Sequence, residues 1–399
     1  MKIVALGGAG MMGQGIVRDL LSDLAIVPIE EISVPDASAE RLSALKAAIG
    51  DDPRLKTSIV DVGDSRSLAQ SLAGYDLCIN AIPTLAGHQM RIFEACLDAH
   101  VAYIDLGGLG VVTVKQLEWR ERFRHAGVTA VISNGSDPGM SNVLCRAVAD
   151  DLDEIDKINL YWAAEVVGPE NPVLVPPYSI STVLAEYAHP NTQFYGGKHV
   201  TCPPLSGLET LDLPEPWGRC TFMHTAHSEQ LTVPLADGIR EKGIQEFTWK
   251  LHLPEREHEA WIGLIKAGFG DFDTPVMVGG ATVKPLDVLN AVLFRNIEQN
   301  ADKIPAQEGH EIHFAIGKGR KNGRSATARC EVIIRPNPMY DTYKDAGTSM
   351  NASIAAQLIM AHPRRPGVFA PEEYFDVGAY VRELERRKFQ VRREVTVDA

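Results

Sequence analysis

Residues 1–13 read MKIVALGGAGMMG, and the predicted fold depends on this stretch. The apolar run Lys2–Leu6 predicts a short buried strand, and Gln14–Leu21 predicts the helix that follows it. A GxGxxG pattern lies between them. In a dinucleotide-binding turn the first glycine permits the tight turn, the second admits the pyrophosphate, and the third lets helix and strand pack closely. The alternative is an ordinary glycine-rich turn. The residues of this loop that we assign to a cofactor are Gly8, Gly10, Met11, Met12 and Gly13.

An acidic residue follows the next predicted strand, Glu31–Val34. Asp36 lies 23 residues after Gly13, near the spacing of about 20 at which a carboxylate binds the adenosine ribose. A carboxylate favours NAD as the cofactor because it repels the 2′-phosphate of NADP. Arg41, about one helical turn further on, leaves NADP possible.

Length, composition and charge narrow the class of protein. A chain of 399 residues with 45% apolar and 23% charged residues is typical of a soluble protein of two or three domains. The net charge of −13 argues against nucleic acid and anionic membranes as partners. We expect a cytoplasmic protein, because there is no long apolar run and no signal-peptide pattern. Six scattered cysteines without a CxxC pair are expected to be reduced thiols, and no spacing of metal ligands appears.

Strands and helices alternate up to about residue 145, which predicts one parallel, doubly wound sheet. Ligands of such sheets bind outside the carboxyl ends of the strands. Asp61 ends the predicted strand Thr57–Val62 and is either an adenine-pocket residue or a turn carboxylate. Asp105 ends the strand Ala102–Leu106 and is either functional or a cap. The strand Asp76–Ala81 leads to Pro83, whose loop is expected near the nicotinamide ribose.

The pattern changes after about residue 150. Ile155–Ala164 and Ile244–Leu253 alternate like antiparallel strands. Glu311–Gly317 and Ala326–Ile334 are predicted to pair through a basic turn, Lys318–Arg324. Strands with separate helices indicate an α+β domain over residues 146–340, after a first domain over residues 1–145.

The last part of the chain, residues 341–399, predicts helices that return to the first domain. Thr348–Met360 is strongly apolar, and Tyr374–Lys388 is an amphipathic, charged helix with which the chain is expected to end.

Several phrases, taken together, resemble the saccharopine dehydrogenase-like (saccharopine reductase) superfamily. They are GGAGMMG, NAIP, YIDLGG, SDPGMSN, PYSIS, MHTAHSE and GVFAPEE, in the same order along essentially the whole chain. Within this superfamily the sequence most resembles the NAD-dependent lysine 6-dehydrogenases. The resemblance implies a Rossmann domain, an inserted α+β substrate and dimerisation domain, and a C-terminal helix back on the first domain. It also implies a homodimer and hydride transfer between a nicotinamide cofactor and a C–N bond.

The resemblance assigns further residues. Asn80–Pro83 and Asp105–Gly107 look like the loops that line the nicotinamide, and Asp137–Gly139 looks like the turn beneath it. The cofactor residues so implied are Asn80, Ala81, Pro83, Gly107 and Pro138. The substrate residues so implied are Ser179 and Ser181, from a serine-rich phrase, and Thr225, from a His-Thr phrase of lysine dehydrogenases. After Thr225 the chain departs from those enzymes, and His227-Ser228-Glu229 looks more like the HPE or HSE of carboxynorspermidine-type relatives.

Amine oxidation needs a base, and histidine needs the least adjustment of its pKa to act as one near neutral pH. We therefore predict His224, His227 and Asp105 as catalytic residues, with Glu229 orienting a histidine or binding a substrate ammonium. The alternative for both histidines is a surface loop. Trp162 is interpreted as a residue of the core or of a dimer interface. Arginines that could bind a substrate carboxylate are Arg219, Arg240 and Arg320.

Three functions are carried forward. The first is oxidative deamination of a basic amino acid or amine, as in lysine 6-dehydrogenase. The second is the reductive condensation of an amine with a keto acid or semialdehyde. The third is a non-catalytic NAD-binding sensor.

Overall fold

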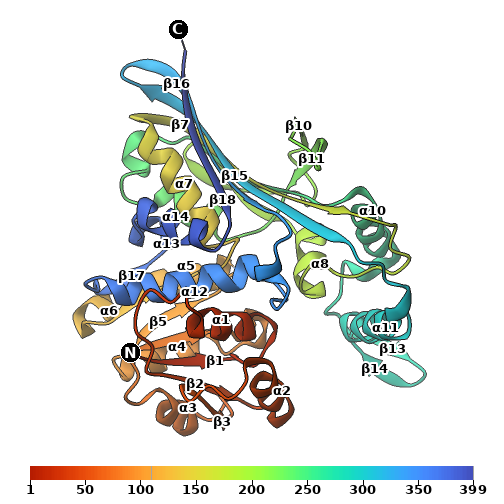
Figure 1. Ribbon diagram of the computed structural model, residues 1–399. Coiled ribbons are helices and arrows are strands. Elements are labelled where there is room, and N and C mark those ends of the chain that lie inside the picture. Colours follow the sequence, from red (N-terminus) through yellow and green to blue (C-terminus); the bar gives the residue numbers. More distant parts are fainter. Residues whose placement is uncertain (109, 399) are drawn as a thin grey trace.

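The described part of the chain forms two large sheets with a long helix between them, and one small two-stranded sheet (Figure 1). A computed structural model describes residues 1–108 and 110–398. In Figure 1 the N-terminal elements lie below, the long strands of the second sheet lie above, and α12 (Ala346–Ala361) runs between them. No helix in these two ranges is long and apolar enough to cross a membrane.

The first sheet is parallel throughout and has the strand order β17-β6-β5-β4-β1-β2-β3. Its central strands are buried on both faces, which explains why their sequences are nearly all apolar. This arrangement confirms the predicted α/β fold. The strands are β1 (Lys2–Leu6), β2 (Glu31–Asp36), β3 (Leu55–Ile59), β4 (Leu77–Asn80), β5 (Ala102–Asp105), β6 (Thr129–Val131) and β17 (Gly367–Phe369).

Helices cover both faces of this sheet, and α12 packs against the first of them, α1. Ser349 of α12 donates to the carbonyl oxygen of Met12 at 3.0 Å, and a side chain on Gly15 would collide with Ser349. α12 is apolar on every side because it is buried on every side. The helices around the sheet are α1 (Met11–Leu21), α2 (Ala39–Ile49), α3 (Ser65–Leu72), α4 (Gln89–Asp98), α5 (Gly110–Leu117) and α6 (Arg120–Ala126).

The second sheet is mixed, with the order β10-β11-β12-β7-β15-β16-β18; β8 also pairs with β12, and β9 pairs with β8. Only the β12–β7 pair is parallel among the described pairs of this sheet. The strands are β7 (Glu154–Val167), β8 (Asn191–Tyr195), β9 (Lys198–Cys202), β10 (Glu209–Asp212), β11 (Arg219–His224), β12 (Glu246–His252), β15 (Glu308–Lys321), β16 (Arg324–Ile334) and β18 (Gln390–Val397).

The β15–β16 hairpin closes on two residues, Asn322 and Gly323, which both have positive φ. The basic stretch Lys318–Arg324 was predicted to be a longer turn. Its cations instead stand mostly on the strand ends, because the Asn-Gly pair alone makes the reversal.

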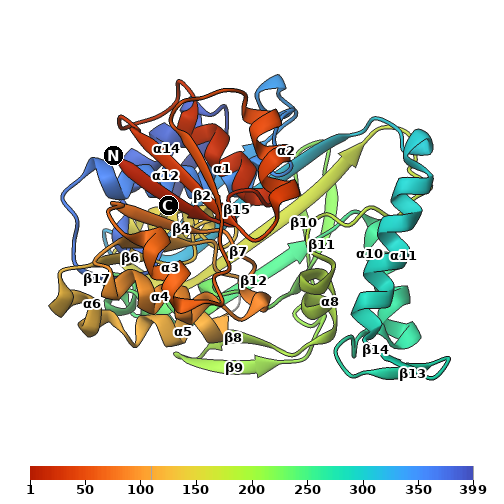
Figure 2. The same ribbon diagram turned by 90° about the horizontal axis from the view of Figure 1, so that it is seen from below.

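Further helices pack on the second sheet, and some of them lead away from it. α10, α11 and the small β13–β14 hairpin lie at the end of the molecule opposite the parallel sheet, as Figures 1 and 2 both show. These elements are α7 (Met140–Asp151), α8 (Ile180–Ala188), α9 (Glu229–Thr232), α10 (Glu255–Leu264), α11 (Pro285–Gln299), α13 (Pro371–Tyr374), α14 (Val377–Arg386), β13 (Val276–Val278) and β14 (Ala281–Val283).

The C-terminal part differs from the prediction that it is helical to its end. It also contributes β17 to the first sheet and β18 to the second, where β18 pairs with the otherwise open edge of β16. The predicted helix Tyr374–Lys388 is divided, because Asp376 caps a new helix by accepting from the Ala379 N–H at 2.7 Å. Arg387 then forms a buried ion pair with Asp19 of α1 at 2.8 Å. The tail thus ties both sheets together.

Candidate active site

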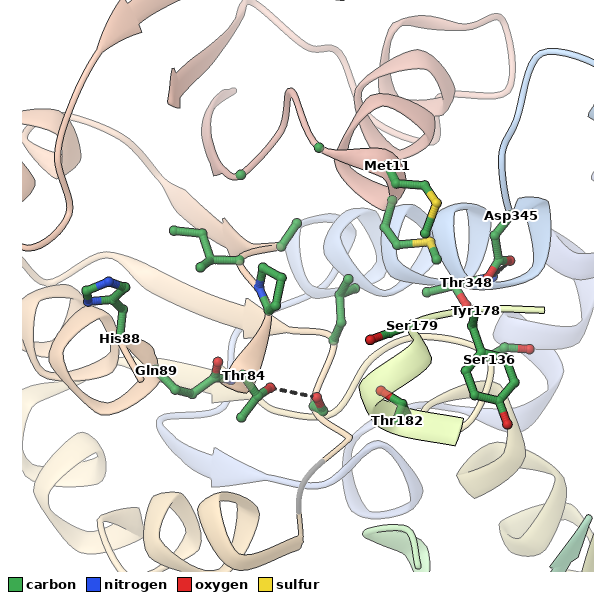
Figure 3. A pocket seen from close by; sticks show the side chains of 18 of the residues that line it. Met11, Thr84, His88, Gln89, Ser136, Tyr178, Ser179, Thr182, Asp345 and Thr348 are labelled. Carbon is green, nitrogen blue, oxygen red and sulfur yellow. Dashed lines mark hydrogen bonds between the residues drawn. The ribbon is translucent and has the colours of Figure 1, made fainter. Parts of the chain in front are cut away.

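A cavity of about 650 Å³ lies where the carboxyl ends of the parallel strands face the second sheet. Figure 3 shows its middle part: Met11 from α1, Thr84 after β4, Ser179 and Thr182 of the α8 region, and Asp345 before α12 all border the same space. The cavity has two chemically different ends, which we call the cofactor end and the substrate end. Residues at the ends of the first three strands line the cofactor end, and residues between 136 and 348 line the substrate end.

The glycine loop forms one wall of the cofactor end. Gly10 and the two methionines after it line the cavity. Gly10 begins α1 without a side-chain cap, so the positive end of the helix opens to the cavity and fits a phosphate. Gly8 and Gly13 do not line it. A Cβ atom on Gly13 would lie 2.2 Å from the Gly7 carbonyl oxygen, so this glycine serves the close packing of helix on turn.

Asp36 lies at the far side of the cofactor end and is buried. Its Oδ1 accepts from the Ser38 N–H at 2.9 Å and from Arg41 Nη2 at 2.8 Å. The Arg41 side chain is 57% exposed and can turn away from this ion pair. Asp61 also lines the cavity, and its Oδ1 accepts from the Gly63 N–H at 2.7 Å. This set of groups fits the adenosine ribose of NAD and also that of NADP.

The loops after β4 and β5 form the middle of the cavity. Ala81, Pro83 and Gly107 line it, and Thr84 Oγ1 donates to the Gly107 carbonyl at 2.9 Å (Figure 3). Asn80 lies behind this wall, where its Oδ1 accepts from the Ile82 N–H at 3.2 Å.

Pro138 does not line the cavity either; its carbonyl accepts from the Gly135 N–H at 2.6 Å. Asn80 and Pro138 therefore shape the loops that line the cavity without reaching it.

Asp105 occupies a fully buried position and does not reach the cavity. Its Oδ2 accepts from Gln89, Tyr103 and Gln116 at 2.6, 2.8 and 2.7 Å, and its Oδ1 accepts from the Ser133 N–H at 2.7 Å. Burial raises the pKa of this carboxyl. A catalytic role does not fit these contacts. Asp105 instead connects the ends of β5 and β6 through these hydrogen bonds, outside the cavity lining.

His224 and Thr225 are also outside the cavity lining, which does not support their predicted roles. His224 is buried at the end of β11, with Nε2 3.1 Å from Tyr195 Oη and Nδ1 3.3 Å from Ser206 Oγ. Burial and the nearby Lys250 lower the pKa of His224 to about 4. The ring packs against Gly207, whose missing side chain leaves the necessary space.

His227 does line the cavity, within a group of residues that we call the His227 cluster: Tyr178, Glu186, His227, Glu229 and Trp249. The ring of His227 stacks on Trp249 with 4.2 Å between the ring centroids. Nε2 lies 3.2 Å from Glu186 Oε1, and Nδ1 lies 3.5 Å from Glu229 Oε2. Burial alone would lower the pKa of His227, but the two carboxylates outweigh burial and raise it to about 10.

Glu229 supports this cluster from behind without lining the cavity. Its Oε1 accepts from Ser141 Oγ at 2.7 Å and from Trp249 Nε1 at 3.1 Å. The prediction that Glu229 orients a histidine fits this position better than the prediction that it binds a substrate.

The start of α8 brings serine and tyrosine side chains to the same place. Ser179 lines the cavity, whereas Ser181 does not and lies behind it, with 2.8 Å between the two hydroxyl oxygens. Tyr178 donates to Glu186. Burial and the charge of Glu186 raise the pKa of Tyr178 well above its usual range, so that it remains a donor.

A second histidine group, the His313 cluster, was missed by the sequence analysis; it consists of Ser136, Asp137, Trp162, Glu311 and His313. His313 of β15 has Nδ1 2.5 Å from Asp137 Oδ2 and Nε2 3.3 Å from Glu311 Oε2. Trp162 Nε1 donates to Glu311 at 3.2 Å. Burial opposes the charge on His313, but Asp137 and Glu311 raise its pKa to about 10.

Trp162 belongs to the buried core, as expected, and it also lines the cavity, which was not expected. The only signal in the sequence was the alternation of β15, which puts Glu311 and His313 on one face of the strand. Nothing in the sequence pointed from this strand to the turn that carries Asp137.

The charge at the substrate end is negative. Four lining carboxylates stand there, and Arg41, at the opposite end, is the only lysine or arginine among the described residues that line the cavity. None of the three arginines proposed for a substrate carboxylate lines it. The four acidic residues are Asp137, Glu186, Glu311 and Asp345. Together with two tryptophans and Tyr178, they suit a cationic substrate with an aliphatic part.

A Rossmann-type sheet whose glycine turn opens into a cavity shared with a second sheet is typical of a dinucleotide-binding enzyme. The family is shown by direct comparison: the chain belongs to the saccharopine dehydrogenase family. The NADP binding domain of saccharopine dehydrogenase matches residues 3–131, and its C-terminal domain matches residues 135–389. The chain is thus an oxidoreductase of amine-related substrates that binds a nicotinamide cofactor, with NAD and NADP both open.

Similar proteins include two enzymes with assigned reactions. The chain is 24% identical to the carboxynorspermidine synthase of Vibrio cholerae over 92% of its own length and 91% of the relative. It is 28% identical to the carboxyaminopropylagmatine dehydrogenase of Synechocystis sp. over 40% of its length and 41% of the relative. The saccharopine dehydrogenase (L-Glu forming) of Saccharomyces cerevisiae has the same fold, with a TM-score of 0.74, 14% identity and 99% of each chain covered.

Proposed function

We propose that this protein is an NAD(P)H-dependent dehydrogenase that joins a diamine to a carbonyl compound by reducing the C=N bond formed between them. This is the second of the three functions drawn from the sequence. The names of the two relatives support this type of reaction, since both describe carboxylated amine products.

The observation that carries the proposal is the anionic, aromatic substrate end. Buried carboxylates bind ammonium groups by charge-assisted hydrogen bonds, which are stronger than neutral ones. The Trp162 and Tyr178 rings, with centroids 6.0 Å apart, offer an apolar wall to the methylene chain between two ammonium groups.

Oxidative deamination of lysine is supported less well. The α-carboxylate of a free amino acid is usually held by an arginine in bidentate contact. Among the described residues that line the substrate end there is none. The diamine itself has no such carboxylate, so in the proposed reaction the mismatch concerns only a carboxylated carbonyl partner.

The cofactor supplies the hydride when it is bound, and the residues of this chain do the rest. The glycine loop and the open start of α1 would hold the pyrophosphate. Asp36 and Arg41 would hold the adenosine ribose, with Arg41 free to meet a 2′-phosphate. The carboxylates of the substrate end would hold the amine, and the aromatic rings would exclude water from the reacting carbon.

The experiment is a panel of paired substrates. NADPH and NADH oxidation would be followed with putrescine, agmatine or lysine, each with and without a semialdehyde or a keto acid. We expect consumption only when amine and carbonyl are both present. Reduction of NAD by lysine alone would favour oxidative deamination instead. Tight cofactor binding without turnover of any pair would favour a non-catalytic sensor.

A further inference from the structure

The reaction needs a group that exchanges a proton with the substrate nitrogen, and the cavity holds two histidines that differ in how they are bound. His227 lies flat on Trp249 and has a carboxylate facing each ring nitrogen. Its ring is held on three sides. His313 also has a carboxylate near each ring nitrogen, but the two distances differ more: Nδ1 lies 2.5 Å from Asp137 Oδ2, whereas Nε2 lies 3.3 Å from Glu311 Oε2.

The other nitrogen of His313 has looser neighbours. Nε2 is 3.3 Å from Glu311 Oε2 and 3.5 Å from Ser136 Oγ, and both of these side chains line the cavity. An aspartate that accepts from Nδ1–H fixes the tautomer and the orientation of an imidazole, so that proton exchange takes place at Nε2. Asp137 Oδ2 lies 2.5 Å from His313 Nδ1, which is close enough for this carboxylate to act in the same way.

The position of the pair within the fold supports the same role. Asp137 comes from the segment after β6, beside the Gly107 loop after β5, and both line the cavity. In sheets of this topology the carboxyl ends of these strands border the reacting end of the dinucleotide. The His227 cluster is instead built around α8 and β12 of the second domain.

We propose that His313 is the proton-transfer residue of this enzyme and that Asp137 is the residue that positions it. The inference rests on the proposed function, because it assigns a step of that reaction. In the reductive direction the imine carbon gains a hydride, the π electrons of C=N become a lone pair on nitrogen, and nitrogen takes the proton from His313 Nε2. The neutral imidazole keeps its proton on Nδ1, beside Asp137, and its Nε2 takes up a proton again from water.

A consequence is that pH should determine whether the enzyme reduces the imine or oxidises the amine. The charged groups that face His313 are Asp137 from the turn before α7, Glu311 from its own strand, and Asp345 before α12. Against burial, Asp137 and Glu311 raise the pKa of His313 to about 10. His313 is therefore an acid at neutral pH, which suits reduction. It becomes a base for amine oxidation only in alkaline solution.

The test compares the His313→Gln variant with a matched control, His310→Gln, which removes a buried histidine of the same strand from outside the cavity lining. For His313→Gln we expect kcat of the reductive reaction to fall about 100- to 10,000-fold. We also expect the alkaline decline of the pH profile to disappear. NADPH binding, followed by fluorescence, should not change, and His310→Gln should behave as the wild type.

Asp137→Asn supplies an independent test if glutamine at residue 313 disturbs folding. Removing this carboxylate should lower the pKa of His313 and move the alkaline decline toward neutral pH. NMR of the isotope-labelled histidines would show the same shift without any cofactor. A His313→Gln enzyme that keeps the wild-type pH profile would overturn the inference, and so would a His313 titration that Asp137→Asn leaves unchanged. Wild-type protein that turns over no amine and carbonyl pair would overturn the proposed function instead.

Discussion

The two ends of the cavity bind by different means. At the cofactor end the important atoms belong to the backbone: a glycine turn, the open start of α1 and short loops after the strands. At the substrate end they belong to buried, charged side chains, in which two imidazoles are paired with carboxylates from distant segments. The difference means that steric changes in the glycine turn should damage cofactor binding alone, whereas changes of charge at the substrate end should damage amine binding alone. Each prediction below tests whether cofactor binding and amine binding are separate in this way.

The largest effect is expected for Gly13→Ala. The added methyl would lie 2.2 Å from the Gly7 carbonyl oxygen, so the turn must shift. We expect NADPH to bind about 100-fold more weakly, since overpacking costs up to about 3 kcal/mol. Gly263→Ala is the matched control, because it changes a helical glycine with open space around it. Equal cofactor affinity of the two variants in a fluorescence titration would contradict this account of the turn.

The next effect is expected for Glu186→Gln at the substrate end. Loss of a buried charged acceptor should raise KM for the amine by about 10- to 100-fold, equivalent to about 1.5–3 kcal/mol, and leave KM for NADPH unchanged. Glu308→Gln is the control, since Glu308 is an exposed carboxylate outside the cavity lining. A parallel rise of both KM values would show that the two ends are not separate.

A smaller effect is expected for Arg41→Ala. The Arg41 side chain is largely exposed, so its contribution to binding of the 2′-phosphate is modest. We expect NADP to bind about fivefold more weakly and NAD to be almost unaffected. Arg66→Ala, an exposed arginine on α3, should change neither affinity. If both cofactors lost affinity equally, Arg41 would not distinguish them.

The smallest effect concerns stability and pH. His227 and His313 both have pKa values raised from the ordinary 6.5 to about 10 in the folded chain. A raised pKa stabilises the fold fully below the unfolded value, and this stabilisation is lost as pH rises through the folded value. The free energy of unfolding, measured with urea, should therefore fall between neutral pH and pH about 10.5, by on the order of 1 kcal/mol or more. The fall should be smaller in His227→Gln, and an identical fall in that variant would refute the assignment.

The two ends also differ in how far they could be predicted. The parallel sheet and its glycine turn follow from contiguous patterns, because each strand, turn and helix is specified locally. Asp36 was found by spacing and lies in the cavity. Asp105 had the right position along the chain, but its side chain turns inward to Gln89 and its neighbours, and spacing does not determine that direction.

The substrate end could be predicted only in part. His227 was found through the resemblance, whereas His313, Asp137 and Trp162 meet only after β7 and β15 pair. Such contacts depend on register between distant strands, which no local pattern contains. The roles of Asp61 and Ser179 and the homodimer stay predictions.

Binding of a diamine to the cofactor-loaded protein tests the central claim most directly. Titration calorimetry would compare putrescine with succinate, which has a similar length and the opposite charge. The account predicts that putrescine binds, that Glu186→Gln weakens this binding, and that succinate does not bind. Binding of succinate in place of putrescine would contradict the assignment of a cation-binding substrate end.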